Sequence, residues 1–334
     1  MRSLRWGAFA HAAVHQMCTA KPGETLLVLA DSWTDMDLAE ACLQSALAAG
    51  CRASLMVIER MGPTDTTELD PAAAGAIIGA DIVLGVCETM FLEKAAVEEA
   101  RKNGTRITST NVVGMEDFAI EGICDVDYDM MIEVAHKVGE LWKKTAHCQV
   151  TSPLGTDISF DMRDRPIDIG DGVVSQPGQV NFFPGVSVAN APIEHTINGV
   201  LVVDGNIPPG RLVREPVKVF IENGVITRFE GGSDAGELEA YFASSGDPIA
   251  THLCHFTLGL NPRARTTGSV HQDEHVLGAI TFGFGDQDPA FGGTVPDCGV
   301  HCDLVLTQAK VTLDGVVMCE ANKLSEDLGL GGLK

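Results

Sequence analysis

The segment KPGETLLVLADSWTDMDLAEACLQSALAAG, residues 21–50, decides the fold class of the first half of the chain. Its apolar run Thr25–Ala30 follows a Lys-Pro-Gly turn and is typical of a short buried strand. From Asp35 to Ala49 apolar residues recur at helical spacing, and this pattern stops near Gly50. A buried strand followed directly by a helix is the repeating unit of a parallel α/β sheet.

The same alternation continues beyond residue 50. Strand and helix patterns follow in turn at 53–58, 71–79, 81–86, 92–102 and 106–108, and a last helix is expected at 132–144. Short apolar strands interleaved with helices predict a parallel sheet covered on both faces. No GxGxxG or phosphate-loop signature follows the first strand, because residues 31–35 stand where glycines would be required. We therefore expect this sheet to be a scaffold.

After Cys148 the share of Gly, Pro and β-branched residues rises, and helical periodicity almost disappears. Strands are expected at 150–152, 157–160, 199–203, 217–222 and 225–229. Asn223-Gly224 matches a tight hairpin turn, because Asn-Gly supplies the positive φ that such a turn needs. The sequence thus predicts an α/β protein with an N-terminal parallel α/β sheet domain at 1–148 and a C-terminal sheet-rich α+β domain at 149–334.

Length and charge restrict the partners. The 334 residues favour about two domains, and 46 acidic against 23 basic residues give a formal net charge of -23. Such a surface repels phosphate backbones and anionic lipids, so we expect neither nucleic acid nor a membrane as partner.

His11, His15 and Gln16 interrupt the first apolar stretch, which favours an amphipathic helix over a secretory signal. The ten cysteines form no CxxC pair and are expected to be reduced thiols of a cytoplasmic protein.

Potential metal ligands gather between residues 252 and 303. They are His252, His255, His271, Asp273, Glu274, His275, His301 and Asp303. Side chains two apart on a strand share a face, so His301 and Asp303 could hold one ion while Cys302 points away. An imidazole and a carboxylate suit a borderline or hard divalent metal. Taken alone, a His-x-Asp sequence is more often a hydrogen-bonded structural pair.

His255 would complete a set of two histidines and one carboxylate. Such a set occupies one face of an octahedral ion and leaves positions for substrate and O₂, or for water. The alternative is that His255 is a hydrogen-bonded core histidine. Glu274 and His275 form another candidate pair, but adjacent residues on a strand face opposite ways, so at most one of them could reach the ion directly.

Several motifs of the second half follow one another in a familiar order. They are GLNP at 259–262, Glu274 with Leu-Gly at 277–278, FGFG at 282–285, FGG at 291–293 and HxDLV at 301–305. This order resembles the C-terminal domain of the aminopeptidase T-like metalloproteins, a superfamily that also contains the iron(II)-dependent 2,5-dihydroxypyridine 5,6-dioxygenases. In the first half, Glu99-Ala100 followed by GTRI at 104–107 is similar to the helix-to-strand crossover of that family.

The resemblance implies a metal ion held by His255, His301 and Asp303, with iron(II) favoured and zinc(II) or manganese(II) as alternatives. The family usually has a glutamate at the position of His255, so this chain would exchange a carboxylate ligand for an imidazole. The aminopeptidases use a further histidine at a place that corresponds here to Thr281. A two-metal peptidase centre would therefore be incomplete.

The dioxygenases that the chain resembles also have two acid/base histidines outside the metal shell. Ungapped matching places them at Glu93, which could transfer protons, and at Gln176, which could only hydrogen-bond. Glu93 could also be an exposed helix carboxylate beside Lys94. Glu194 or His195 is expected to line the pocket, which makes Glu93, Gln176 and Glu194 the candidate catalytic side chains.

The first hypothesis is therefore an iron(II)-dependent ring-opening dioxygenase that acts on a small hydroxylated, nitrogen-containing aromatic ring. The second is a single-metal hydrolase of an amide, a peptide or a cyclic amide, in which the ion activates water. The third is a non-catalytic binding protein that has kept the fold. A small-molecule substrate is expected, and family analogy adds the expectation of a homo-oligomer.

Overall fold

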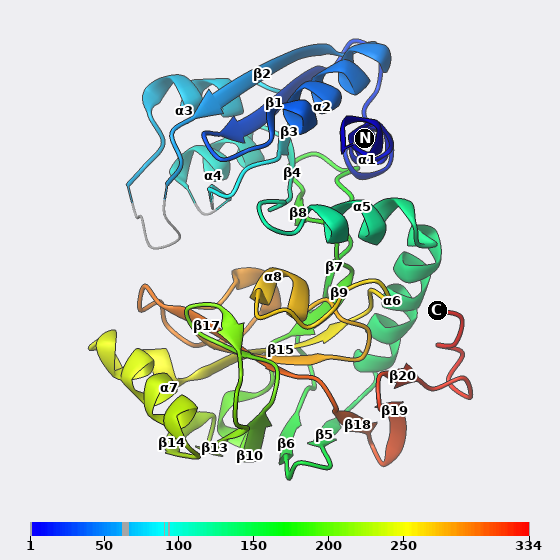
Figure 1. Cartoon of the computed structure of the whole chain (residues 1–334). Helices are drawn as coiled ribbons and strands as arrows, with labels where there is room; N and C mark the ends of the chain where they lie inside the picture. Colours follow the sequence, from blue (N-terminus) through cyan, green and yellow to red (C-terminus); the bar gives the residue numbers. More distant parts are fainter. Residues whose placement is uncertain (1, 62–66, 90, 93, 334) are drawn as a thin grey trace. The chain divides into compact units, whose positions relative to one another are not determined.

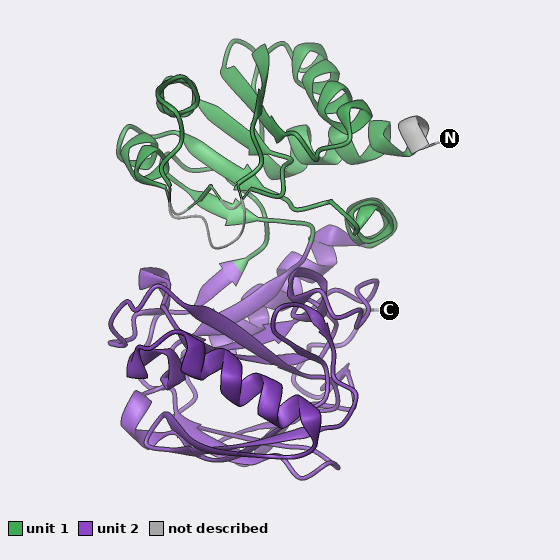
Figure 2. Ribbon diagram, turned by 60° about the vertical axis from the view of Figure 1, so that its left-hand side comes forward, with its two compact units in different colours: residues 1–126, 170–184 green, residues 127–169, 185–334 purple. Residues whose placement is uncertain are grey.

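The computed structural model describes residues 2–61, 67–89, 91–92 and 94–333 of the chain (Figure 1). It separates into two compact units: unit 1 comprises 1–126 with 170–184, and unit 2 comprises 127–169 with 185–334 (Figure 2). These units differ from the boundary expected after Cys148. Helix α6 (Tyr128–Trp142), expected to end the first domain, belongs to unit 2, and segment 170–184 returns to unit 1.

Unit 1 contains a five-stranded sheet in the order β2-β1-β3-β4-β8. Its strands are β1 (Thr25–Asp31), β2 (Arg52–Ile58), β3 (Ile82–Gly85), β4 (Arg106–Ser109) and β8 (Val180–Phe182). All pairings between neighbours are parallel, which confirms the sheet predicted from the strand and helix alternation. Strand β8 was not predicted, because it comes from a Gly- and Pro-rich stretch of the second half of the chain.

Two of the helices described in unit 1, α2 (Met36–Ala48) and α3 (Pro71–Ile78), begin at a capping aspartate. The others described are α1 (Arg2–Ala12), which continues into the π-helical turn η1 (Ala13–Met17), α4 (Ala95–Lys102) and α5 (Glu116–Cys124). Asp35 accepts a hydrogen bond from the Asp37 N–H at the start of α2, and Asp70 does the same for Ala72 at the start of α3. Such caps satisfy N–H groups that have no partner inside a helix.

Unit 2 is built on two larger sheets, with strand orders β14-β13-β10-β6-β5-β18-β19-β20 and β17-β16-β15-β9-β7. The first sheet contains β5 (His147–Thr151), β6 (Asp157–Asp161), β10 (Asn198–Val203), β13 (Val217–Glu222), β14 (Val225–Glu230), β18 (Lys310–Leu313), β19 (Val316–Glu320) and β20 (Lys323–Leu324). The second contains β7 (Asp168–Gly170), β9 (Ser187–Asn190), β15 (Leu253–Gly259), β16 (Ile280–Gly285) and β17 (His301–Leu306). The predicted hairpin is confirmed, since Asn223 and Gly224 join β13 and β14 with φ values of 51° and 80°.

Shorter elements complete unit 2. They are the strands β11 (Asn206–Ile207) and β12 (Arg211–Leu212), the helices α7 (Ser233–Ser244) and α8 (Val270–Asp273), and the 3₁₀ turns η2 (Glu194–Thr196), η3 (Pro248–Thr251) and η4 (Pro289–Phe291). The expectation that helical periodicity almost disappears in this half is wrong for α7. Its buried apolar stripe is narrow, with Ala235, Leu238 and Phe242 as its members, and is easily missed in a polar segment. Among the helices described, none is both long and apolar enough to cross a membrane.

An aromatic cluster joins the two sheets of unit 2. Phe256 of β15 stacks on Trp142 of α6 with ring centroids 4.9 Å apart, and it meets Phe160 of β6 at 5.1 Å. Phe282 of β16 lies 5.5 Å from Phe256. Since successive side chains of a strand point to opposite faces, burying Phe256 in this cluster turns its neighbours His255 and Thr257 to the other face of the sheet.

A buried carboxylate fixes the start of α7. Asp234 accepts hydrogen bonds from Arg211 Nη2 at 2.8 Å and from the Arg214 N–H at 2.6 Å. The hydrogen bond from Arg211 outweighs burial and holds the pKa of Asp234 well below its usual range. The loop 211–215 therefore depends on an ionised Asp234.

We expect Asp234→Asn to lower the free energy of unfolding by about 2 kcal/mol at neutral pH, because the amide loses charge-assisted hydrogen bonds. The folded-state pKa is the lower one, so this stabilisation is present above the unfolded pKa of about 4 and is lost as the pH falls toward the folded value. Denaturant unfolding at neutral and acidic pH measures both effects.

Glu237→Gln is the matched control, since Glu237 also contacts Arg211 but its side chain is 49% exposed. A loss below about 0.5 kcal/mol is expected for this surface pair. Equal losses in the two variants, or a pH-independent loss at Asp234, would contradict the assignment.

Candidate metal centre

Three neighbouring strands of unit 2 bring the predicted ligands together. His255 lies on β15, His301 and Asp303 lie on β17, and β16 runs between them. In the strand register, His255 and Asp303 both pair with Gly283 of β16. A Cβ atom at Gly283 would collide with the His255 ring, so the glycine is what allows this ring to extend across β16.

The donor atoms lie within hydrogen-bonding distance of one another. His255 Nε2 is 3.3 Å from His301 Nε2 and 3.0 Å from Asp303 Oδ1, and His301 Nε2 is 3.2 Å from Asp303 Oδ2. His301 and Asp303 therefore share one face of β17, as predicted. Neighbouring ligands of an ion with bonds of about 2.1 Å are about 3.0 Å apart in octahedral and about 3.4 Å apart in tetrahedral geometry. The three side chains fit a single divalent ion.

One oxygen of this group has no hydrogen-bond donor among the described residues. Asp303 Oδ1 is buried, and within the described part of the chain no group donates a hydrogen bond to it, although His255 Nε2 is close. A buried carboxylate oxygen without a donor costs free energy, which a cation at this point would offset. This unsatisfied oxygen is a second sign of a metal site.

The far side of each ring is held by the protein. His301 Nδ1 is 2.7 Å from the carbonyl oxygen of Asp286, and His255 Nδ1 is 3.0 Å from Thr257 Oγ1. A carbonyl only accepts hydrogen bonds, so His301 Nδ1 must carry the proton, and in the neutral ring Nε2 then presents its lone pair. Such contacts orient metal-binding histidines and set their tautomer.

The charges of the group are coupled. Loss of solvent would lower the pKa of His301, but the adjacent Asp303 carboxylate raises it well above its usual value. Burial would raise the pKa of Asp303, yet the charge on His301 lowers it well below its usual range. A bound cation would take over the role of the His301 proton. Burial is the main cause that raises the pKa of Glu274, and repulsion from Asp303 raises it further, to about 8. This carboxyl is therefore protonated at neutral pH.

The other candidate ligands have local partners. Glu274 and His275 follow helix α8, so the argument from strand alternation does not apply to them. Burial lowers the pKa of His275 to about 4, and its Nδ1 lies 2.9 Å from the His271 carbonyl oxygen. His252 Nδ1 contacts the Pro248 carbonyl oxygen, and Asp273 accepts hydrogen bonds from the 267–268 backbone.

The candidate catalytic residues have different surroundings. Glu93 lies outside the described residues. Gln176 is exposed in unit 1, where its backbone N–H donates to Gln179 Oε1. Glu194 is held in η2, with Oε2 2.5 Å from Arg165 Nη2 and Oε1 2.7 Å from the Thr294 nitrogen. Burial would raise the pKa of Glu194, but these contacts lower it below its usual value. His195 is exposed.

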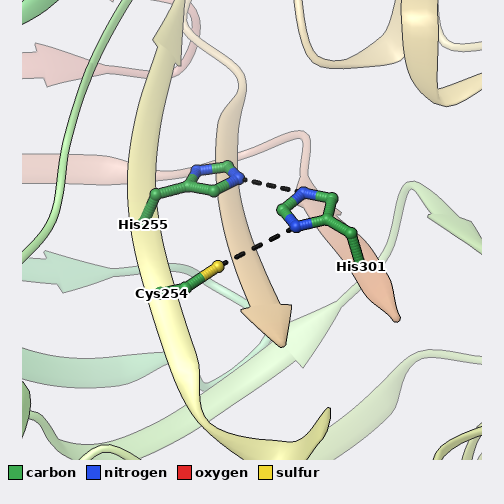
Figure 3. Close-up of side chains that lie close together, drawn as sticks. All are labelled: Cys254, His255 and His301. Carbon is green, nitrogen blue, oxygen red and sulfur yellow. Dashed lines mark hydrogen bonds between the residues drawn. The ribbon is translucent and has the colours of Figure 1, made fainter. Parts of the chain in front are cut away.

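Two neighbours of the centre were not predicted from the sequence. The Cys254 thiol lies 4.0 Å from His301 Nδ1, and Cys254, His255 and His301 offer ligand atoms within 4.8 Å of one another (Figure 3). The Phe291 ring, from η4, is 5.2 Å from the His255 ring. Neither contact has a sequence signal, because a cysteine next to a histidine normally faces the other way and Phe291 lies in a loop.

Comparisons with known proteins cover most of the chain. The family model for 2,5-dihydroxypyridine 5,6-dioxygenase (NicX) matches residues 8–326. The enzyme of that name from Pseudomonas putida strain KT2440 is 27% identical over 265 residues, 74% of this chain and 73% of the relative.

Two solved structures share the fold. The 2,5-dihydroxypyridine dioxygenase of Pseudomonas putida KT2440 has a TM-score of 0.81 at 22% identity and covers 97% of this chain and 98% of its own. AmpT of Thermus thermophilus has a TM-score of 0.67 at 14% identity and covers 97% of this chain and 100% of its own. At these identities the likeness establishes the fold alone.

We expect His255→Ala and His301→Ala each to weaken iron(II) or manganese(II) binding by about tenfold or more, because each removes a donor atom from a three-residue set. Elemental analysis after anaerobic equilibration at defined free metal concentrations measures the loss. His252→Ala serves as the control, since its ring nitrogen Nδ1 contacts the carbonyl oxygen of Pro248, and should bind metal as the unmodified protein does. Unchanged binding by His255→Ala would remove His255 from the ligand set.

Proposed function

The chain belongs to the 2,5-dihydroxypyridine 5,6-dioxygenase family, and we propose that it opens a small hydroxylated, nitrogen-containing aromatic ring with iron(II) held by His255, His301 and Asp303. The dioxygenase activity predicted from the sequence follows from this membership, and the predicted superfamily and fold class are confirmed. The observation that carries the choice of metal site is the convergence of two imidazole nitrogens and one carboxylate within 3.3 Å.

The donor set supports iron(II) as the cofactor. Dioxygenase chemistry implies a metal, and two histidines with one carboxylate are the usual ligands of oxygen-dependent iron(II) enzymes. Zinc(II) and manganese(II) accept similar ligands and are the alternatives. When bound, the ion supplies the redox centre and the open coordination positions that ring-opening oxygenation needs.

The protein's own part is to orient the ligands and shape their surroundings. Asp286 and Thr257 fix the two imidazoles, so their Nε2 atoms point at one place without rearrangement. Phe291 adds an apolar surface beside the His255 ring, which suits a planar aromatic substrate. The His301 side chain is 39% exposed, which leaves the group accessible from that side.

Proton transfer needs a group that both holds and releases a proton near neutral pH. The Glu274 carboxyl is such a group, because burial and the charge of Asp303 raise its pKa to about 8. Because this carboxyl is protonated at neutral pH, we propose that Glu274 donates a proton during the reaction. Glu93 and Gln176 stay predictions, since Glu93 lies outside the described residues and Gln176 belongs to unit 1.

Glu194 supports the site in another way. Both of its carboxylate oxygens are engaged, one by Arg165 and one by Thr294, and Arg165 also donates to the Gly292 carbonyl. These contacts hold the loop that carries Phe291. We therefore propose Glu194 as a positioning residue rather than a proton-transfer residue.

We further propose that the protein acts on a small molecule as a cytoplasmic homo-oligomer. The hydrolase alternative draws on the likeness to AmpT, which extends to the fold alone.

Protein purified without oxygen and loaded with iron(II) should consume O₂ equimolar with the ring opened, and 2,5-dihydroxypyridine is the first substrate to try. An oxygen electrode read together with the loss of aromatic absorbance measures the ratio. His301→Ala treated in the same way is the control. Turnover without O₂, or full turnover with zinc alone, would favour the hydrolase instead.

We expect Glu194→Gln to lower kcat by about ten- to a hundredfold through a displaced loop, with an unchanged pH profile. Arg165→Lys should have a similar effect, because lysine cannot make the two directed contacts of a guanidinium. Glu222→Gln, on an exposed position of β13, is the neutral control. A changed pH profile in Glu194→Gln, with Arg165→Lys fully active, would instead assign proton transfer to Glu194.

A further inference from the structure

Cys254 and His255 are consecutive residues of β15, yet both approach the His301 ring (Figure 3). On a regular strand, consecutive side chains point to opposite faces of the sheet. The pair therefore needs a local irregularity in the strand.

That irregularity is a register shift. Leu253 pairs with Phe284 and His255 pairs with Gly283, so two steps along β15 correspond to one step along β16. Cys254 is the extra residue of this β-bulge. Bulges commonly redirect a side chain near a functional site.

The bulge brings a thiol to the second nitrogen of a metal-binding imidazole. Cys254 is 1% exposed, and its Sγ lies 4.0 Å from His301 Nδ1 and 3.4 Å from the Asp286 carbonyl oxygen. The two ring nitrogens of His301 thus face different metal-binding side chains. Nε2 faces His255 and Asp303, and Nδ1 faces Cys254.

We propose that Cys254, His255 and His301 form a second coordination mode of this centre, which takes thiophilic divalent ions such as cadmium(II) or zinc(II). The inference rests on the same two histidines as the proposed function but on a different third ligand. In this proposal, Cys254 favours soft ions and Asp303 favours hard ions, so the two side chains together determine which ion binds.

The chemistry of the third ligand decides which mode an ion adopts. Thiolate sulfur prefers soft and borderline ions, whereas a carboxylate prefers hard ions such as manganese(II). Binding through sulfur breaks the S–H bond of Cys254, forms a sulfur–metal bond and releases the proton to solvent, with no change of oxidation state.

The second coordination mode costs free energy, because it disrupts hydrogen bonding to the Asp286 carbonyl oxygen. Both the Cys254 thiol and the His301 N–H donate to this oxygen, and an ion bound by the Cys254 sulfur would replace the hydrogen bond from the thiol. Only an ion with a strong preference for sulfur compensates for that loss. Hard ions therefore stay with the carboxylate.

Cadmium(II) and manganese(II) titrations of the full-length, metal-free protein test the proposal. The cadmium complex should show thiolate-to-cadmium ultraviolet absorption. Cys254→Ser should lose this absorption and weaken cadmium binding by about tenfold or more, while manganese affinity changes by less than about threefold. Asp303→Asn should do the reverse and weaken manganese binding more than cadmium binding.

Cys302→Ser is the matched control. Cys302 is a buried thiol between two ligands of β17, but it faces away from the ion, so its variant should keep the cadmium absorption. Cadmium NMR of the unmodified protein needs no variant, and a thiolate ligand should move the resonance downfield. A resonance typical of nitrogen and oxygen ligands alone, or an undiminished absorption in Cys254→Ser, would overturn the proposal. Loss of cadmium binding in Cys254→Ser with manganese binding retained supports the inference, whereas binding of both metals unaffected in His301→Ala would remove the proposed function as well.

Discussion

The centre depends on one electrostatic constraint: the Asp303 carboxylate and two imidazole nitrogens lie too close together to remain without a positive charge among them. Without an ion, a proton on His301 supplies that charge, which is why the pKa of His301 rises while that of Asp303 falls. A divalent ion supplies it more fully, since it also satisfies the Asp303 oxygen that has no hydrogen-bond donor among the described residues. The arrangement of these three side chains therefore favours a cation among them.

The fold meets this constraint through strand register. His255 reaches Asp303 only because Gly283 stands between them on β16, and the burial of Phe256 in the aromatic cluster decides which face His255 takes. A slip of one residue would move the histidine into the core and the phenylalanine to the centre. The large core of unit 2 therefore does more than stabilise the protein, because it determines which side chains can meet at the ion.

Sequence patterns predicted the features that rest on local periodicity. The alternation around Thr25–Ala30 predicts the parallel sheet, Asn223-Gly224 predicts the hairpin, and the His-x-Asp spacing predicts one shared face for His301 and Asp303. Features that depend on tertiary pairing could not be predicted in this way. Strand β8 (Val180–Phe182) is defined by its partner β4, and the bulge at Cys254 is defined by the register of β16. The ion pair of Arg165 and Glu194 joins residues from separate loops, and neither residue carries a local signal of it.

The Asp286 carbonyl oxygen contacts both His301 and Cys254, so its position affects both side chains. It fixes the tautomer of His301, accepts the Cys254 thiol, and lies in a loop whose start is held by Asp286 Oδ1 through the backbone of Cys298 and Gly299. If this oxygen moved away, His301 Nδ1 could bind metal. The relative metal affinities of the carboxylate site and the thiolate site would then change, although the same ligand side chains are present. Selectivity in such a centre is thus a property of the loop that orients the histidine as much as of the donor atoms themselves.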